Sequence, residues 1–116
     1  MIQITIALGD KETGETDTIQ ITAEKTGSRY MAIHPDIKGG SKFASEGYTI
    51  THIPTGIAIA QHLARKIDAE RAVNSLILLD DVDWSVSDRD YFLKHRVRIK
   101  DRLDVYEKIP REEFNK

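Results

Sequence analysis

The chain of 116 residues contains no cysteine, which removes several classes of chemistry at once. Without thiols there can be no disulfide bond, no zinc site with thiolate ligands and no cysteine nucleophile. A large excess of one charge is lacking as well, because 17 basic residues face 19 acidic ones and the net charge is −2. This balance argues against a general nucleic-acid-binding protein, whose surface must be strongly basic.

Long apolar runs are also missing from the sequence. No stretch approaches the roughly 20 apolar residues that a membrane-spanning helix requires. The N-terminus alternates apolar and polar residues and lacks the basic segment and apolar core of a secretory signal peptide. We therefore expect a cytoplasmic protein with no membrane partner.

Motifs for catalysis, for nucleotide phosphates and for metal ions are absent from the sequence. There is no P-loop, no dinucleotide-binding GxGxxG loop and no GxSxG nucleophile elbow. The histidines form no HxH or HExxH pair, so a metal site would need ligands from distant parts of the chain. We therefore predict no catalytic residue, no metal and no cofactor; the four histidines are His34, His52, His62 and His95.

Alternating apolar and polar residues predict an antiparallel sheet in the first half of the chain. Residues 1–8 place isoleucine or leucine at every second position, and residues 18–23 alternate in the same way, so the two segments form a hairpin. Residues 29–33 predict a third strand, which Pro35 ends because proline has no N–H for a ladder. Residues 48–53, rich in β-branched side chains, predict a fourth strand after a loop that contains glycine.

The next part of the chain has the residue spacing of helices. Ile59, Leu63 and Ile67 recur at i, i+4 and i+8, which predicts a helix with Thr55 as its N-cap. A fresh apolar face after Asp68 predicts a second helix, either separate from the first or joined to it by a bend.

The segment 88–109 has two interpretations. Phe92, Ile99 and Leu103 fit one face of a helix that starts beside Ser87, whereas the alternation over residues 95–100 also fits a strand. We favour the helix because the segment is rich in good helix formers.

These elements predict a single α+β domain over residues 1–116. A small antiparallel sheet of about four strands occupies 1–53, and two or three C-terminal helices within 57–109 pack on one face of it. A sheet this small, followed by a helix that carries aromatic and arginine side chains, indicates a homo-oligomer that completes its core by self-association.

The clearest charge feature is a basic cluster at 94–102. Arg98 and Arg102 lie one helical turn apart, and their planar guanidinium groups could hold a phosphate or carboxylate. The alternative is a solvated face in which Asp101 and Asp104 balance the arginines. Trp84, just upstream, could stack on a nucleotide base or lie in the core.

A second candidate anion site lies at the junction of the fourth strand and the predicted helix. His52 and Thr55 would stand beside the free N–H groups of a helix N-terminus, which attract anions. Plain helix capping and a satisfied histidine are the simpler interpretation. Arg29, beside Tyr30 at a strand start, is a further candidate, and the predicted ligand-binding residues are therefore Arg98, Arg102, Trp84, Arg29, Thr55 and His52.

Two segments, GSRYMAIHPDI at 27–37 and GYTITHIPTGIAIAQHL at 47–63, are similar to those of small phage-encoded proteins. The overall plan, a short antiparallel sheet followed by helices that carry arginines, resembles the Thoeris anti-defence sponge proteins. That family sequesters cyclic nucleotide signals between subunits without cleaving them. The resemblance is architectural, covers most of the chain and transfers no individual binding residue; it implies a phage protein that acts in the host cytoplasm.

The leading hypothesis is a non-catalytic protein that sequesters a phosphorylated, nucleotide-like small molecule at a subunit interface. Two alternatives come from other functional classes. One is an inhibitor or regulatory module that binds another protein, and the other is a small enzyme whose active site has no readable motif.

Overall fold

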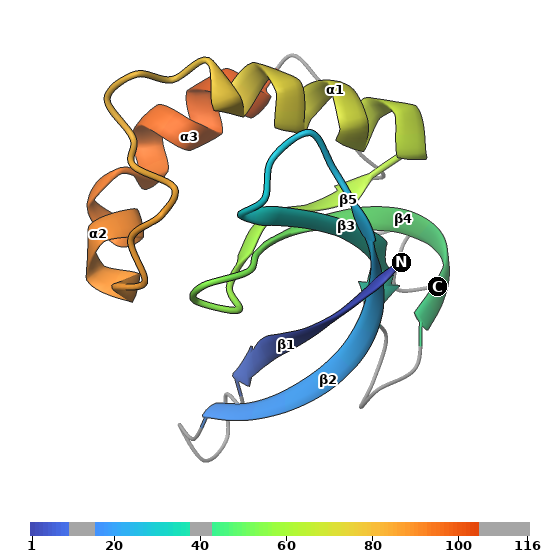
Figure 1. The fold of residues 1–116 in the computed structure, drawn as a ribbon. Helices are drawn as coiled ribbons and strands as arrows, with labels where there is room; N and C mark the ends of the chain where they lie inside the picture. The colour runs from blue at the N-terminus through green and yellow to red at the C-terminus, as the bar shows by residue number, and fades with distance from the viewer. Residues whose placement is uncertain (10–15, 38–42, 105–116) are drawn as a thin grey trace.

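The computed structural model describes residues 1–9, 16–37 and 43–104. Within these ranges five strands precede three helices, which confirms the α+β class with an antiparallel sheet and C-terminal helices packed against it (Figure 1). The elements are β1 (Ile2–Gly9), β2 (Thr16–Lys25), β3 (Met31–Ile37), β4 (Phe43–His52), β5 (Ala58–Leu63), α1 (Lys66–Ile77), α2 (Arg89–Lys94) and α3 (Arg96–Leu103).

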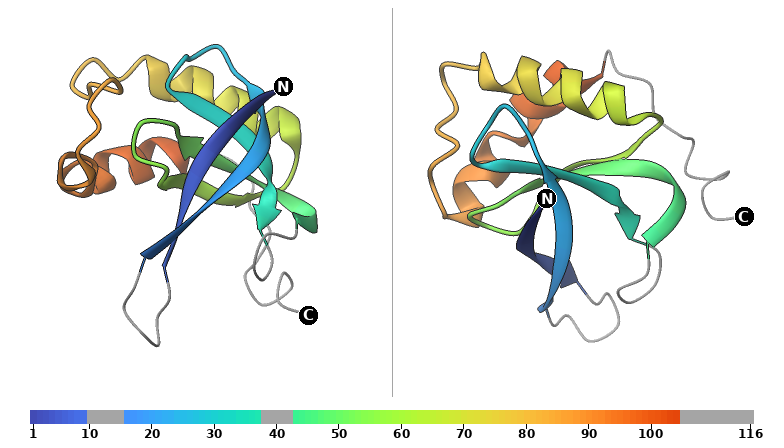
Figure 2. Two further views of the ribbon diagram at one scale, coloured as in Figure 1. Left: turned by 60° about the horizontal axis from the view of Figure 1, so that its bottom comes forward. Right: turned by 45° about the vertical axis from the view of Figure 1, so that its right-hand side comes forward.

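The strands follow one another in the order β1-β2-β3-β4-β5, each antiparallel to the next. The predicted β1–β2 hairpin is paired from Ile2 with Ala23 to Gly9 with Thr16. By contrast, β2 reaches β3 only through Glu24 and Lys25. The hairpin therefore bends across the layer of β3, β4 and β5, as Figure 2 shows, and lies on the side opposite the helices (Figure 1).

The layer of β3, β4 and β5 is consequently covered on both faces. On one face, Met31, Ile33, Ile50 and Leu63 pack with buried side chains of the three helices. On the other face, the isoleucines of the hairpin form a second core, which consists of Ile4, Ile6, Ile21, Ala23 and Ala32. The amide of Ala7 donates a 2.9 Å hydrogen bond to the carbonyl of Gly56, which ties β1 to the turn between β4 and β5.

The helix predicted after Thr55 is wrong, because residues 58–63 form strand β5. Ala60 and Leu63 are both buried although they are three positions apart, a spacing that a regular strand would put on opposite faces. The register explains this: Ile50 opposes Ala60 and Tyr48 opposes Leu63, so β5 carries one extra residue between Ala60 and Leu63 and forms a β-bulge there. A second register shift lies between Ala58, which opposes Thr51, and Ala60. The bulge reverses the alternation and gives a strand the apolar spacing of a helix.

Other predicted boundaries also shift. Strand β3 passes through Pro35, where a register irregularity accommodates the missing N–H. Strand β4 begins at Phe43, before the predicted residue 48. The second predicted helix exists as α1, but Arg65 precedes its first turn and Asp68 lies inside that turn.

The segment predicted as one helix over 88–109 forms two, α2 and α3, which meet at His95. The N-cap of α2 is Asp88, whose carboxylate accepts the amide of Asp90 at 3.0 Å, in place of the predicted Ser87. Residues 105–109 of the predicted helix lie outside the described part of the chain. Within the described ranges, none of the helices is long and apolar enough to cross a membrane.

The first prediction concerns the core beneath α1. Replacement Leu63→Ala should lower the free energy of unfolding by about 2–5 kcal/mol, because Leu63 is fully buried and the change leaves a cavity. The replacement Ile59→Ala should lower the free energy of unfolding by less, because Ile59 is only half-buried. Urea unfolding of both variants measures the difference, and an unchanged Leu63→Ala protein would contradict this packing.

Candidate functional site

A groove lies between the start of β5 and the two short helices α2 and α3. Its volume is about 550 Å³. The start of β5 provides one wall through Ile57 and Ile59, and α2 and α3 provide the other through Leu93, Val97 and Ile99. We call this hollow the β5–α3 groove; its apolar walls suit the body of a small organic molecule.

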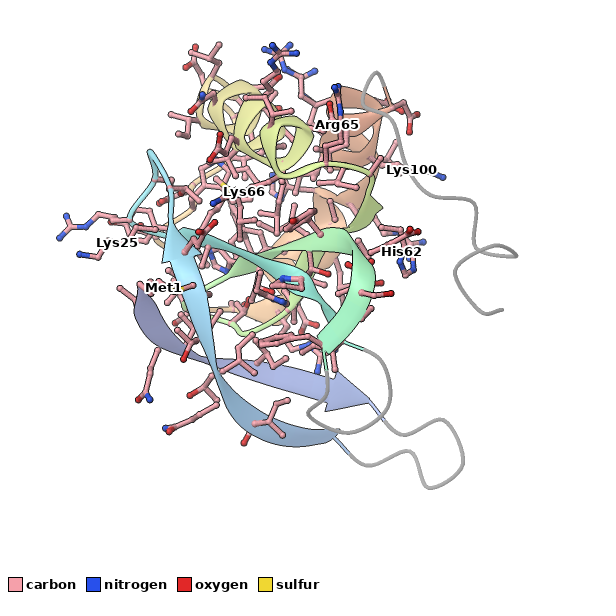
Figure 3. The ribbon with its side chains drawn as sticks, turned by 90° about the vertical axis from the view of Figure 1, so that its right-hand side faces the viewer. Met1, Lys25, His62, Arg65, Lys66 and Lys100 are labelled. Atoms are coloured by element: carbon pink, nitrogen blue, oxygen red, sulfur yellow. The ribbon has the colours of Figure 1, made fainter. Side chains whose placement is uncertain are left out.

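Two cations from α3 also line the β5–α3 groove. Arg96 and Lys100 are exposed and lie four residues apart, which puts them on the same face of the helix. Lys100 lies on the side of the molecule where β5 ends, as His62 and Arg65 do (Figure 3). The groove therefore combines apolar walls with two positive charges.

The predicted pair Arg98 and Arg102 lies elsewhere on α3, toward the elements around α1. The Nε of Arg98 donates to the carboxylate of Asp81 at 3.1 Å, and this contact lowers the pKa of Asp81. The Nε of Arg102 donates to the carbonyl of Ser75 at 3.4 Å. The cations among the described residues that line the β5–α3 groove are Arg96 and Lys100. They belong to the same basic cluster at 94–102 but are not the predicted pair.

Arg29 and Trp84 meet at a second hollow of about 320 Å³, between the β2–β3 turn and the segment after α1. Trp84 is only 7% exposed, and its Nε1 donates to the carbonyl of Leu76 at 3.2 Å. Its ring stacks on Phe92 with centroids 5.8 Å apart. Trp84 thus lies mainly in the core, while the Arg29 guanidinium lies over the Tyr30 ring, 5.8 Å from its centroid.

Hydrogen bonds link Thr55 to His52 and His52 to Trp84. The Nε2 of His52 lies 2.6 Å from the Trp84 carbonyl, so Nε2 carries the proton and donates it. The Nδ1 of His52 then accepts from the Thr55 hydroxyl at 2.8 Å. Thr55 lies in the turn before β5 and caps no helix, so the helix N-terminus predicted there as an anion site does not exist.

A buried polar cluster, which no sequence pattern predicted, is centred on Asp36. This carboxylate accepts three hydrogen bonds: from the hydroxyl of Thr49 at 2.5 Å, from the His62 amide at 3.2 Å and from the His62 Nδ1 at 2.8 Å. His62 has a φ of 63°, a left-handed conformation that costs a non-glycine residue roughly 1–2 kcal/mol. Asp36 therefore holds the strained residue of the bulge in place from two strands away.

His34 lies beside this cluster on the hairpin side of the sheet. Its Nδ1 donates to the Pro35 carbonyl at 2.8 Å and its Nε2 accepts from the Thr51 hydroxyl at 2.7 Å, an arrangement that suits the neutral ring. Burial lowers the pKa of His34, and burial likewise lowers the pKa of His52. Over the described residues, no group of three or more histidine, aspartate or glutamate side chains is placed to hold a metal ion.

The second prediction tests Asp36. Asp36→Asn should lower the free energy of unfolding by at least about 1.5–3 kcal/mol, because the contacts to a charged acceptor are weakened. Adding His62→Gly should recover part of this loss, since glycine adopts a positive φ without strain. Asp101→Asn, at an exposed position, is the matched control, and an Asp36→Asn protein that unfolds like the parent would refute this role.

The third prediction concerns acid. His34 and His52 have folded-state pKa values below the ordinary 6.5, so the unfolded chain binds more protons once the pH falls below that value. Their contribution is complete above pH 6.5 and is lost as the pH falls toward the lowered pKa values, by at most about 1.4 kcal/mol per pH unit for each histidine. Unfolding between pH 7.5 and 5 measures this slope, and His34→Gln should make it shallower; a flat profile for the parent would exclude the linkage.

We compared the chain with protein-family models, curated proteins and solved structures. No family model, no curated protein and no solved structure matches it. Function must therefore be argued from the geometry of the β5–α3 groove and its surroundings.

Proposed function

We propose that this protein binds a small phosphorylated molecule in the β5–α3 groove and holds it without converting it. The apolar body of the ligand lies between β5 and α3, and its phosphate contacts Arg96 and Lys100. A nucleotide-like molecule is the ligand class that the sequence predicts. Sequestration of such a molecule is the role that the resemblance to anti-defence sponge proteins implies.

The observation that carries this proposal is the combination of the groove's apolar walls with two cations one turn apart. Apolar walls bind the faces of a flat ring by burying them. The Arg96 guanidinium can hold two phosphate oxygens through its planar fork, and the Lys100 ammonium adds a point charge. Together these groups give affinity for an amphipathic anion.

The lining also favours binding over catalysis. The described residues around the groove contribute aliphatic side chains, one phenylalanine, Arg96 and Lys100. They include no carboxylate, imidazole or hydroxyl group that could transfer a proton to or from a bound molecule. Retention of the ligand is the chemistry that this set of groups supports.

The fourth prediction tests the site by calorimetric titration with linear nucleotides, cyclic nucleotides and a short alkyl phosphate. Arg96→Ala or Lys100→Ala should weaken binding about 10- to 150-fold, the worth of a charge-assisted contact. Arg96→Lys keeps the charge but loses the fork, so its affinity should lie between those of the parent and Arg96→Ala.

Arg98→Ala and Arg102→Ala are the matched controls, because they remove the same charge from the same helix outside the groove. Loss of affinity in these two variants alone would move the site to the pair predicted from sequence. Chromatography of the recovered ligand separates sequestration, which returns it intact, from catalysis. A parent protein that binds none of the three ligand classes contradicts the proposal.

A further inference from the structure

The apolar walls of the β5–α3 groove are almost entirely aliphatic. Branched side chains line both sides, and they are Ile57, Ile59, Leu93, Val97, Ile99 and Leu103. Leu93 is 51% exposed and Val97 is 66% exposed, so the groove offers aliphatic surface that a ligand can still cover. Covering such surface removes it from water and contributes to affinity in proportion to the area buried.

The aromatic ring at the groove is not placed to stack on a nucleotide base. Phe92 is only 4% exposed. Its ring packs against His52, with centroids 4.2 Å apart, and stacks on Trp84, with centroids 5.8 Å apart. Base stacking needs an open aromatic face, and within the described lining Phe92 is the one aromatic side chain. The groove therefore offers a base little beyond aliphatic contact.

The polar edge of a base would also lack a suitable partner among these side chains. A base carries donors and acceptors in its plane, and burying any of them unpaired lowers affinity. The polar side chains of the described lining are Arg96 and Lys100. Both donate hydrogen bonds and accept none, and the proposed function uses them for the phosphate.

A hydrocarbon chain has no polar edge and needs no stacking partner. We infer that the ligand is an aliphatic phosphate monoester, whose single chain lies between Ile59 and Val97 while its phosphate contacts Arg96 and Lys100. This inference rests on the proposed function, because it keeps the phosphate where that proposal places it and specifies the body of the ligand. Val97 and Lys100 are three residues apart on α3 and hence neighbours on one helix face. The chain can therefore begin directly at the ester oxygen, with no sugar between it and the phosphate.

Calorimetric titration with n-alkyl phosphates, from ethyl to octyl and below their micelle-forming concentrations, tests the role of the chain. Each added methylene should tighten binding by up to about fourfold, the equivalent of about 0.8 kcal/mol of buried surface, until the chain outgrows the groove. The heat-capacity change of binding should become more negative as the chain lengthens. Adenosine monophosphate carries its phosphate on a sugar and a base, and it should bind more weakly than octyl phosphate.

The variant Val97→Asn tests the wall without removing a charge. It should lower the affinity for octyl phosphate at least about threefold and leave that for ethyl phosphate unchanged, because an amide in place of the isopropyl group interrupts the aliphatic surface. Leu78→Asn is the matched control, since Leu78 is 68% exposed and lies outside the described lining of the groove. It should leave the affinities of the whole series unchanged.

Vesicles distinguish two sources of this chemistry. Co-sedimentation with phosphatidylcholine vesicles that contain hexadecyl phosphate, but not with phosphatidylcholine alone, would identify a membrane lipid as the source. Absence of co-sedimentation together with tight binding of octyl phosphate would identify a free ester.

An affinity that is indifferent to chain length overturns the inference and leaves the proposed function standing. So does adenosine monophosphate that binds more tightly than every alkyl phosphate, or a Val97→Asn protein that binds octyl phosphate like the parent. A gain with chain length that persists at undiminished affinity in the double variant Arg96→Ala/Lys100→Ala keeps the aliphatic groove and removes the proposed function. A parent that binds neither the alkyl phosphates nor adenosine monophosphate contradicts both.

Discussion

The geometry of this protein depends on one buried carboxylate. Burying the charge of Asp36 is costly, and the cost is offset because Thr49 and the amide and ring of His62 all donate to it. These contacts hold His62 in the left-handed conformation at which β5 gains its extra residue. As a result Ala60 and Leu63 both enter the core below the helices, and the chain leaves β5 in the direction of α1.

The groove depends on two contacts between distant parts of the chain, that of Asp36 with His62 and that of His52 with Trp84. Asp36 fixes the end of β5, across a separation of 26 residues. His52 fixes the opposite wall, because its bond to the Trp84 carbonyl spans 32 residues and anchors the segment that leads into α2. Phe92, which lines the groove from α2, packs directly on His52, with ring centroids 4.2 Å apart. The helical wall is thus held from the sheet through His52, and the strand wall belongs to β5, whose other end Asp36 holds.

The alternation of apolar and polar residues along the chain predicted those strands that have one buried and one exposed face. The alternation in residues 1–8 and 18–23 predicted the hairpin, because each strand has one buried face. Strand β5 was not predictable in this way, since its bulge produces the spacing of three and four residues that a helix also has. The residues of the groove were not predicted: the pairs Arg98/Arg102 and Arg96/Lys100 both have the spacing of one helical turn, and it is Arg96 and Lys100 that line the groove. The role of Asp36 had no local signal, because all its partners come from other strands.

The contact between Ala7 and Gly56 has a consequence for how the molecule can move. A side chain at position 56 would begin 2.8 Å from the carbonyl oxygen of Thr5, so the turn approaches β1 as closely as glycine alone permits. Besides this contact and its small core, the described part of the hairpin is joined to the rest of the fold where Glu24 and Lys25 pair with β3 and where Glu24 accepts from Lys66 of α1. The hairpin is thus built like a flap with its hinge at the end of β2. It is the part of the sheet expected to open first, exposing His34 and its neighbours to water while the helical half stays folded.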